Sequence, residues 1–404
     1  MCKADSTRFT KRTRQTHRWL KTENTLTLFD DFNDSERLAA ANECWAWVES
    51  FLRKIEDSVS LSIPTSDISR FNLSRPYSWT PVSQITHEMV ELAKEVSVRT
   101  GGFYDPASCH LTDIWGFSPR TFAQDYRPRF AYDRPRLDDG SIPAPNPDYL
   151  AAAIKLCGPD GVTAERRQGK TGLIKTADDV LVAGEKMSFA LDLGGIAKGW
   201  VCDAVLKTVK RCGFEYAAYS CESSMALAGS ASTLAMRRGD GCYTVSLARP
   251  RKRAGVRNYA QIWVRDRAVA TSGDYGRCFE KDGIRYSHII NPRTGMPLNV
   301  SQENAFGGNG HQSGLCTVTL VGPDAARADA LATAMCLMGR EGAVSFYNDE
   351  LASEGWDFLA LEYDNARPGY LGLITSLFGD GLRLLDNLEI VSSVDATGKV
   401  MLKS

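Results

Sequence analysis

A glycine-rich segment, LDLGGIAKG at residues 191–199, joins an apolar run to the start of a helical pattern. Such a turn places backbone amides and Lys198 at the positive end of a helix, where a phosphate group can bind. Its spacing matches neither the P-loop nor the dinucleotide-binding glycine turn. The residues alone therefore leave two interpretations open, an anion site and an ordinary strand-to-helix turn that uses glycine for its backbone angles.

A second segment with possible chemistry is ADALATA, residues 328–334. Asp329 and Thr333 are four residues apart, so a helix would place their oxygens on one face, one turn from each other. Hard cations such as Mg²⁺ bind carboxylate and hydroxyl oxygens of this kind. The alternative is structural: the aspartate caps the helix and the threonine bonds back to a carbonyl group. Taken alone, the segment favours this alternative.

The third segment is YSHIINPRTG, residues 286–295, which contains one of the five histidines of the chain. A strand delivers His288 to a loop that Pro292 and Gly295 constrain. A histidine in this place could orient a phosphate or carry a proton. A lone histidine is more often a hydrogen-bonded structural residue, so the segment by itself predicts no catalytic role.

The elements that must position these segments follow from hydrophobic periodicity. Helical spacing begins near Asp34, near residue 83, after residue 149, after Lys198 and at Pro323. Short strand patterns occupy residues 217–227, 242–248, 259–270, 285–291 and 315–321. Because strands outnumber the helical crossovers that a parallel sheet needs, the sequence predicts an α+β fold with largely antiparallel sheets.

Composition excludes several classes of protein. A net charge of −1 over 404 residues argues against a nucleic-acid partner, and no apolar run is long enough for a membrane span. The start of the chain lacks the apolar core of a signal peptide, and the 11 cysteines contain no Cys-x-x-Cys pair. These features predict a cytoplasmic protein without zinc knuckles or a disulfide framework. Basic residues dominate positions 1–24, which we expect to form a disordered arm.

Five segments taken together resemble the ApbE family, the FAD:protein FMN transferases. In chain order they are SDISRFN, GGFYDPASCHLTDIWGF, LDLGGIAKGWVCDAV, ATSGDYGRCFEKDGIRYSHIINPRTGMPLN and DALATAMCLMG. The resemblance covers residues 25–350, interrupted by a predicted surface excursion at 118–148 and followed by an extension at 351–404. It implies an ApbE-like α+β fold, with mixed, largely antiparallel sheets flanked by helices. The implied activity is Mg²⁺-dependent transfer of FMN from FAD to a Ser or Thr hydroxyl of an acceptor flavoprotein, with release of AMP.

The resemblance also implies roles for individual residues. The proton acceptor for the target hydroxyl would be His288, with Asp329 as the rival base. Mg²⁺ would be held by side-chain or backbone oxygens of Gly195, Asp329, Ala332 and Thr333. FAD would be bound by Asn72, Phe103, Tyr104, Asp105, Asp192, Lys198, His288 and Ile290.

The chain departs from the family pattern at several of these places. Where the family usually has Asn-x-Gly-Gly, the segment YSCESSMALAG has Ser220, Glu222 and Ser223, so close backbone approach to a ligand is not expected there. Other departures are Asn291 in place of an aspartate, and Pro106 and Ala107 in place of a small residue and a threonine. Two alternatives therefore stay open beside the transferase: an FAD pyrophosphatase that releases FMN and AMP, and a non-catalytic FAD-binding protein.

Overall fold

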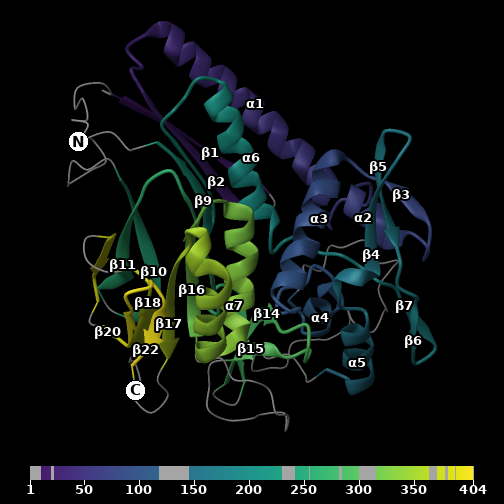
Figure 1. Ribbon diagram of the computed structural model, residues 1–404. Coiled ribbons are helices and arrows are strands. Elements are labelled where there is room, and N and C mark those ends of the chain that lie inside the picture. The colour runs from purple at the N-terminus through teal and green to yellow at the C-terminus, as the bar shows by residue number, and fades with distance from the viewer. Residues whose placement is uncertain are drawn as a thin grey trace.

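A nine-stranded sheet forms the centre of the computed structural model (Figure 1). The structure describes residues 11–19, 22–117, 145–229, 242–253, 255–281, 284–299, 315–363, 371–377, 381–386 and 388–403. In spatial order the strands are β1 (Lys11–Trp19), β2 (Thr22–Asp30), β8 (Ala217–Cys221), β9 (Ser224–Ala228), β12 (Ala268–Gly273), β16 (Leu315–Gly322), β17 (Asp357–Tyr363), β18 (Leu371–Thr375) and β20 (Glu389–Ile390). All neighbours pair antiparallel except β18 and β20. The predicted α+β class with largely antiparallel sheets is confirmed.

Three helices pack near the sheet. They are α1 (Ser35–Val59), α6 (Ala197–Arg211) and α7 (Ala325–Phe346). Helix α6 contacts β8 and β9, and α7 contacts β12 and β16, so the two helices lie together over the middle of the sheet (Figure 1). Every residue of β16 is buried, as expected for a central strand covered by a helix.

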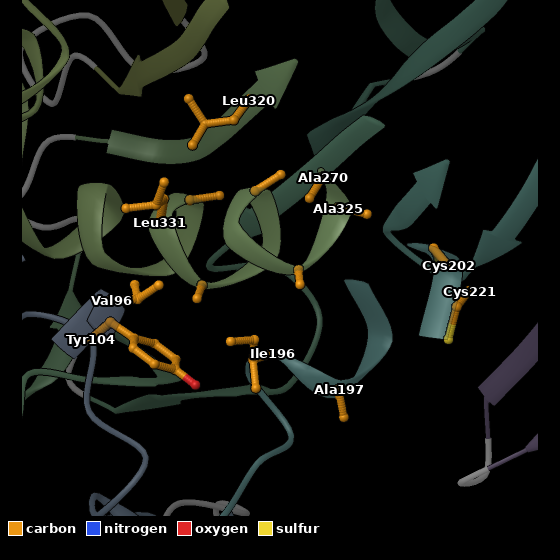
Figure 2. Packing of buried hydrophobic residues seen from close by; sticks show 14 of the residues in the cluster. Val96, Tyr104, Ile196, Ala197, Cys202, Cys221, Ala270, Leu320, Ala325 and Leu331 are labelled. Atoms are coloured by element: carbon orange, nitrogen blue, oxygen red, sulfur yellow. The ribbon is translucent and has the colours of Figure 1, made fainter. Parts of the chain in front are cut away.

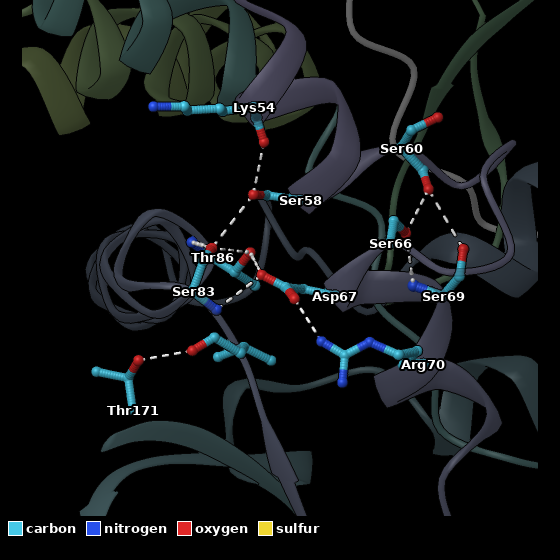
Figure 3. Close-up of polar contacts among 11 residues, drawn as sticks. Lys54, Ser58, Ser60, Ser66, Asp67, Ser69, Arg70, Ser83, Thr86 and Thr171 are labelled. Carbon is cyan, nitrogen blue, oxygen red and sulfur yellow. Dashed lines mark hydrogen bonds and ion pairs between the residues drawn. The ribbon is translucent and has the colours of Figure 1, made fainter. Parts of the chain in front are cut away.

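A smaller helical region adjoins this layer. It contains α2 (Asp67–Leu73), α3 (Gln84–Arg99), α4 (Cys109–Ile114), α5 (Pro147–Lys155) and two small sheets, one of β3 (Trp79–Pro81), β5 (Lys170–Lys175) and β4 (Val162–Arg167), the other of β6 (Val180–Val182) and β7 (Glu185–Met187). Figure 3 shows the polar network that joins α2 to α3. The buried Asp67 carboxylate accepts hydrogen bonds from the Ser83 amide and the Thr86 hydroxyl, both 2.8 Å long, and pairs with Arg70. This network fixes the helix that carries the SRFN motif.

The remaining strands form hairpins outside the central sheet. They are β10 (Tyr243–Arg253), β11 (Val256–Val264) and β19 (Leu382–Leu384); β13 (Cys278–Lys281), β14 (Ile284–Ile290) and β15 (Pro297–Asn299); and β21 (Ser392–Val394) with β22 (Val400–Leu402). Short helical turns of other types lie at Pro159–Gly161, Tyr347–Leu351 and Ala352–Glu354. No helix in the described ranges is long and apolar enough to cross a membrane.

The ends of the chain differ from the sequence prediction. Residues 11–19 and 22–24, predicted to belong to a disordered arm, form strand β1 and the start of β2. Pairing along the whole of β2 satisfies the backbone of this polar segment, and Trp19 is only 3% exposed. Residues 1–10 lie outside the described ranges, as does most of the predicted excursion, residues 118–144. Beyond residue 351, β17 and β18 lie inside the central sheet, so the predicted extension helps to build the core.

Candidate functional site

The candidate site forms where the first turn of α6 meets the first turns of α7. A Cβ atom on Gly199 would lie 2.0 Å from the Ala325 carbonyl oxygen, so only glycine permits this approach of the two helices. The Asp203 carboxylate further along α6 accepts hydrogen bonds of 2.9 Å from the Ala325 and Ala326 amides at the start of α7. Figure 2 shows the first turn of α6, with Ile196 and Ala197, beside α7. The two helices therefore hold their N-terminal turns together.

Asp329 lies at this contact and is 2% exposed. Its Oδ2 accepts a hydrogen bond from the Gly199 amide at 3.2 Å and lies 3.3 Å from the Lys198 ammonium. Burial raises the pKa of the Asp329 carboxyl, and the positive charge of Lys198 and the Gly199 amide only partly offset this effect. The charges and hydrogen bonds of the protein therefore compensate only part of the cost of burying this carboxylate.

Lys198 is the cation of the site. Burial has the largest single effect and works to lower the pKa of its ammonium group, but the Asp329 carboxylate, together with Cys221 and Glu222, outweighs burial and the pKa is raised. The ammonium also donates to the Gly194 carbonyl at 3.2 Å, and the side chain is 21% exposed. Lys198 therefore stays protonated at neutral pH while part of its surface can reach an anion.

The glycine turn before α6 is held by Asp192 and by the ring of Tyr104. Asp192 Oδ1 accepts a hydrogen bond from the Gly194 amide at 2.8 Å, while its own amide donates to the Pro106 carbonyl at 2.8 Å. A Cβ atom on Gly195 would lie 3.1 Å from the Tyr104 ring. The Tyr104 hydroxyl is buried and makes no hydrogen bond to the described part of the chain, and burial and nearby Asp329 raise its pKa well above the usual value. The glycine turn is therefore held by the Asp192 hydrogen bond and by packing against the Tyr104 ring.

Two predicted FAD ligands have their polar groups engaged by the protein backbone. The Asn72 side chain, fully buried, donates to the Leu191 carbonyl at 3.0 Å and accepts from the Leu191 amide at 2.9 Å. Asp105 accepts hydrogen bonds from the amides of Ala107 and Gly158; burial raises its pKa to about 6 although these amides favour the charged form. Both residues thus support the loops that carry the site, instead of presenting free polar groups to a ligand.

Two further residues from the predicted FAD set are apolar contacts. Phe103 is half-buried and lies under the Arg293 guanidinium, whose carbon is 4.7 Å from the ring centroid. Ile290 is 5% exposed at the end of β14. The cation–π contact with Arg293 holds the Phe103 ring in one orientation, so Phe103 presents a fixed aromatic surface.

Thr333 behaves partly as the structural alternative predicts. Its hydroxyl donates to the Asp329 carbonyl at 3.1 Å and shares a second hydrogen bond of 2.9 Å with the Ser272 hydroxyl of β12. Asp329, in contrast, does not cap α7, because Asp324 caps it through the Arg327 amide. The Asp329 side chain is left to interact with α6.

His288 lies in strand β14, two residues before its end. Its Nδ1 is 3.0 Å from the Arg277 carbonyl oxygen, which requires a proton on Nδ1 and leaves the lone pair on Nε2. Burial lowers the pKa of His288 to about 4, with smaller contributions of the same sign from Arg277 and Lys198. The imidazole is therefore neutral at pH 7 and able to accept a proton at Nε2.

The altered YSCESSMALAG segment also reaches the site. Glu222 and Ser223 form the turn between β8 and β9, and the buried Ser224 hydroxyl is close enough to Asp329 to lower the pKa of that carboxyl. Sequence reasoning did not single out Ser224, Ser272 or Gly199. All three lie inside the segments quoted above, but their roles depend on contacts with α7 that no local pattern encodes.

The donors at this site suit a hard cation. In the described residues, no three His, Cys, Asp or Glu side chains converge as a metal cluster. Lys198 and the Gly199 amide only partly offset the burial of the Asp329 carboxylate, and the Thr333 hydroxyl lies one helical turn away. Mg²⁺ typically takes one or two protein carboxylates and completes its shell with water and phosphate oxygens. The residues present fit such an ion.

Known proteins resemble this chain over most of its length. The ApbE family model matches residues 20–354. The FAD:protein FMN transferase of Vibrio cholerae is 28% identical over 295 residues, which are 73% of each chain, and that of Treponema pallidum is 26% identical over 348 residues, 84% of this chain and 81% of the relative. The solved structure of the flavin transferase ApbE from Vibrio cholerae has a TM-score of 0.66 at 23% identity, covering 90% of this chain and 97% of its own. At that identity the structural match shows a shared fold.

Proposed function

This chain belongs to the ApbE family, and from this premise we propose that it transfers the FMN part of FAD to a Ser or Thr hydroxyl of an acceptor flavoprotein, releasing AMP. Relatives named FAD:protein FMN transferase support the proposal. The observation that carries it is the ion pair of Lys198 and Asp329 at the start of α6, with neutral His288 in electrostatic reach. Phosphoryl-type transfer needs positioned charge and a proton acceptor more than a protein nucleophile.

We assign FAD binding to the glycine turn and its surroundings. The positive end of α6 and the Lys198 ammonium suit the diphosphate. Phe103 and Tyr104 offer ring surface to the flavin or the adenine, and Ile290 borders the diphosphate. Asp192, Asn72 and Asp105 keep the turn and its neighbouring loops in place through their backbone hydrogen bonds.

We assign Mg²⁺ to Asp329 and Thr333, with backbone oxygens of Gly195 and Ala332 as further ligands. When bound, the ion neutralises charge on the diphosphate oxygens. With the ion held by Asp329, Lys198 would be available to contact a phosphate oxygen. The buried carboxylate with its raised pKa is the feature that supports this assignment.

His288 is assigned as the proton acceptor. In the proposed step the acceptor hydroxyl oxygen bonds to the FMN phosphorus while the bond from that phosphorus to the AMP oxygen breaks. The hydroxyl proton passes to Nε2 of His288, whose Nδ1 proton stays hydrogen-bonded to the Arg277 carbonyl. The negative diphosphate counteracts the effect of burial and raises the basicity of the imidazole on binding. Asp329 is the weaker candidate, because Lys198 and the Gly199 amide engage its Oδ2.

The decisive experiment incubates the protein with FAD, Mg²⁺ and flavoproteins of the same organism. Flavin fluorescence that stays with a denatured acceptor, together with equimolar AMP, supports transfer. Free FMN and AMP without a labelled acceptor would identify a pyrophosphatase, and FAD that co-purifies without AMP under any metal would identify a binding protein. Either result refutes the transferase. The scattered free cysteines suit a reducing compartment, so we expect the enzyme and its acceptor in the cytosolic fraction.

A further inference from the structure

Glu222 has an unusual backbone at the candidate site. It is the first residue of the turn between β8 and β9, in which Cys221 pairs with Ser224, and its φ is +54°. That left-handed conformation favours glycine, and other residues adopt it at a cost. The turn is held from both sides, since the Glu222 amide donates to the Glu23 carbonyl at 3.3 Å and the Ser223 carbonyl accepts from the Thr271 amide at 3.0 Å. A side chain is thus present where glycine would be less strained.

A hydrogen bond to helix α6 places this turn near the start of that helix. The Cys202 thiol donates to the Ser224 carbonyl at 3.4 Å, and Cys202 follows Lys198 by four residues, on the same helix face. Figure 2 shows Cys202 and Cys221 next to each other between α6 and the strands. The tip of the hairpin therefore adjoins the pair of Lys198 and Asp329.

Glu222 brings a carboxylate to this turn. Its side chain is exposed, and its carboxylate acts electrostatically on Lys198 and on Tyr275. Among the three neighbours Lys198, Asp329 and Glu222, one positive charge faces two negative charges. An incoming diphosphate thus meets a locally negative group of side chains until a cation is added.

We infer that Glu222 determines how strongly FAD binding depends on a divalent cation. Its carboxylate repels the diphosphate when no cation is present, and a cation held by Asp329 offsets that repulsion. The inference rests on the proposed function, because it takes FAD as the ligand and Asp329 as the cation ligand. It requires no direct contact between Glu222 and FAD, since charges across about 10 Å of a hydrated surface still interact measurably.

The test compares FAD dissociation constants, from quenching of flavin fluorescence, in EDTA and in millimolar Mg²⁺. Glu222→Gln keeps the side-chain shape and the backbone strain but removes the negative charge. Glu222→Gly removes the charge and the strain together. In EDTA we expect Glu222→Gln to bind FAD roughly fourfold more tightly than the wild type at low salt. In Mg²⁺ the difference should fall below about twofold. Glu36→Gln, which removes an exposed carboxylate from the first turn of α1, should leave both constants unchanged.

Two results would overturn the inference while leaving the transferase intact. One is equal FAD affinity of the wild type and Glu222→Gln in EDTA. The other is a loss of affinity in Glu222→Gln that appears only with Mg²⁺, because Glu222 would then be a cation ligand and not a repelling charge. If the wild type binds no FAD under either condition, the proposed function and this inference both fail.

Discussion

Protonation of His288 should destabilise the folded protein as the pH falls from 8 to 5. The pKa of this histidine is lowered from 6.5 to about 4, chiefly by burial, so the folded protein favours the neutral ring. The stabilisation is present in full above pH 6.5 and is lost as the pH falls through 6.5 towards 4. Linkage with these two values gives a loss of about 2 kcal/mol at pH 5, and about 3 kcal/mol once the pH is below both.

The assay is urea denaturation of the wild type and of His288→Asn at pH 8 and pH 5. The asparagine amide can still donate to the Arg277 carbonyl, which accepts the Nδ1 proton in the wild type, but it does not titrate. Other groups titrate in both proteins, and their effects cancel in the difference. We expect the wild type to lose about 2 kcal/mol more than the variant between the two pH values.

Parallel losses in the two proteins, within about 0.5 kcal/mol, would refute the reasoning. They would mean that the imidazole is solvated well enough to keep an ordinary pKa. His288 would then be partly charged at neutral pH, and its assignment as a neutral proton acceptor would fall with the prediction.

Three further substitutions test the architecture of the site. Asp329→Ala should abolish Mg²⁺-dependent turnover of FAD, and retained turnover would contradict the metal assignment. Gly199→Ala should lower the free energy of unfolding, measured in urea, by about 1–3 kcal/mol, because the new methyl group would lie 2.0 Å from the Ala325 carbonyl oxygen. Wild-type stability in this variant would contradict the close approach of α6 and α7. Asn72→Ala should cost about 2–3 kcal/mol by the same measurement, since it leaves the buried Leu191 amide and carbonyl without their partners, and a loss under 1 kcal/mol would argue against this role.

The sequence identified the segments of the candidate site, but it did not show which of their side chains bind the protein backbone. Lys198 and Asp329, more than a hundred residues apart, were both selected from local motifs, and the structure brings them into contact. Asn72 and Asp105 were predicted from the family resemblance as FAD ligands, yet their polar groups bind backbone. A motif specifies which side chain is present, but whether its hydrogen bonds serve a ligand or a loop depends on which backbone the fold places beside it.

The ends of the chain show that local patterns also predict the fold incompletely. Local alternation predicted antiparallel strands in the middle of the chain, and that class is confirmed. The basic segment before residue 24 has no apolar stripe, so periodicity alone predicted disorder there. It pairs instead with β2, because an edge strand gains its stability from backbone hydrogen bonds to a partner and tolerates polar side chains.

The sequence by itself predicted the family and the fold class, and it placed Lys198, Asp329 and His288 in segments whose residue types could serve a diphosphate, a cation and a proton. Those properties depend on residue type, spacing and hydrophobic period, all of which are local. Only the tertiary structure decided that Gly199 lets α6 touch α7, that burial lowers the pKa of His288 and raises that of Asp329, and that the turn with Glu222 lies against α6. Close approach and desolvation arise between distant segments, and no local pattern encodes them.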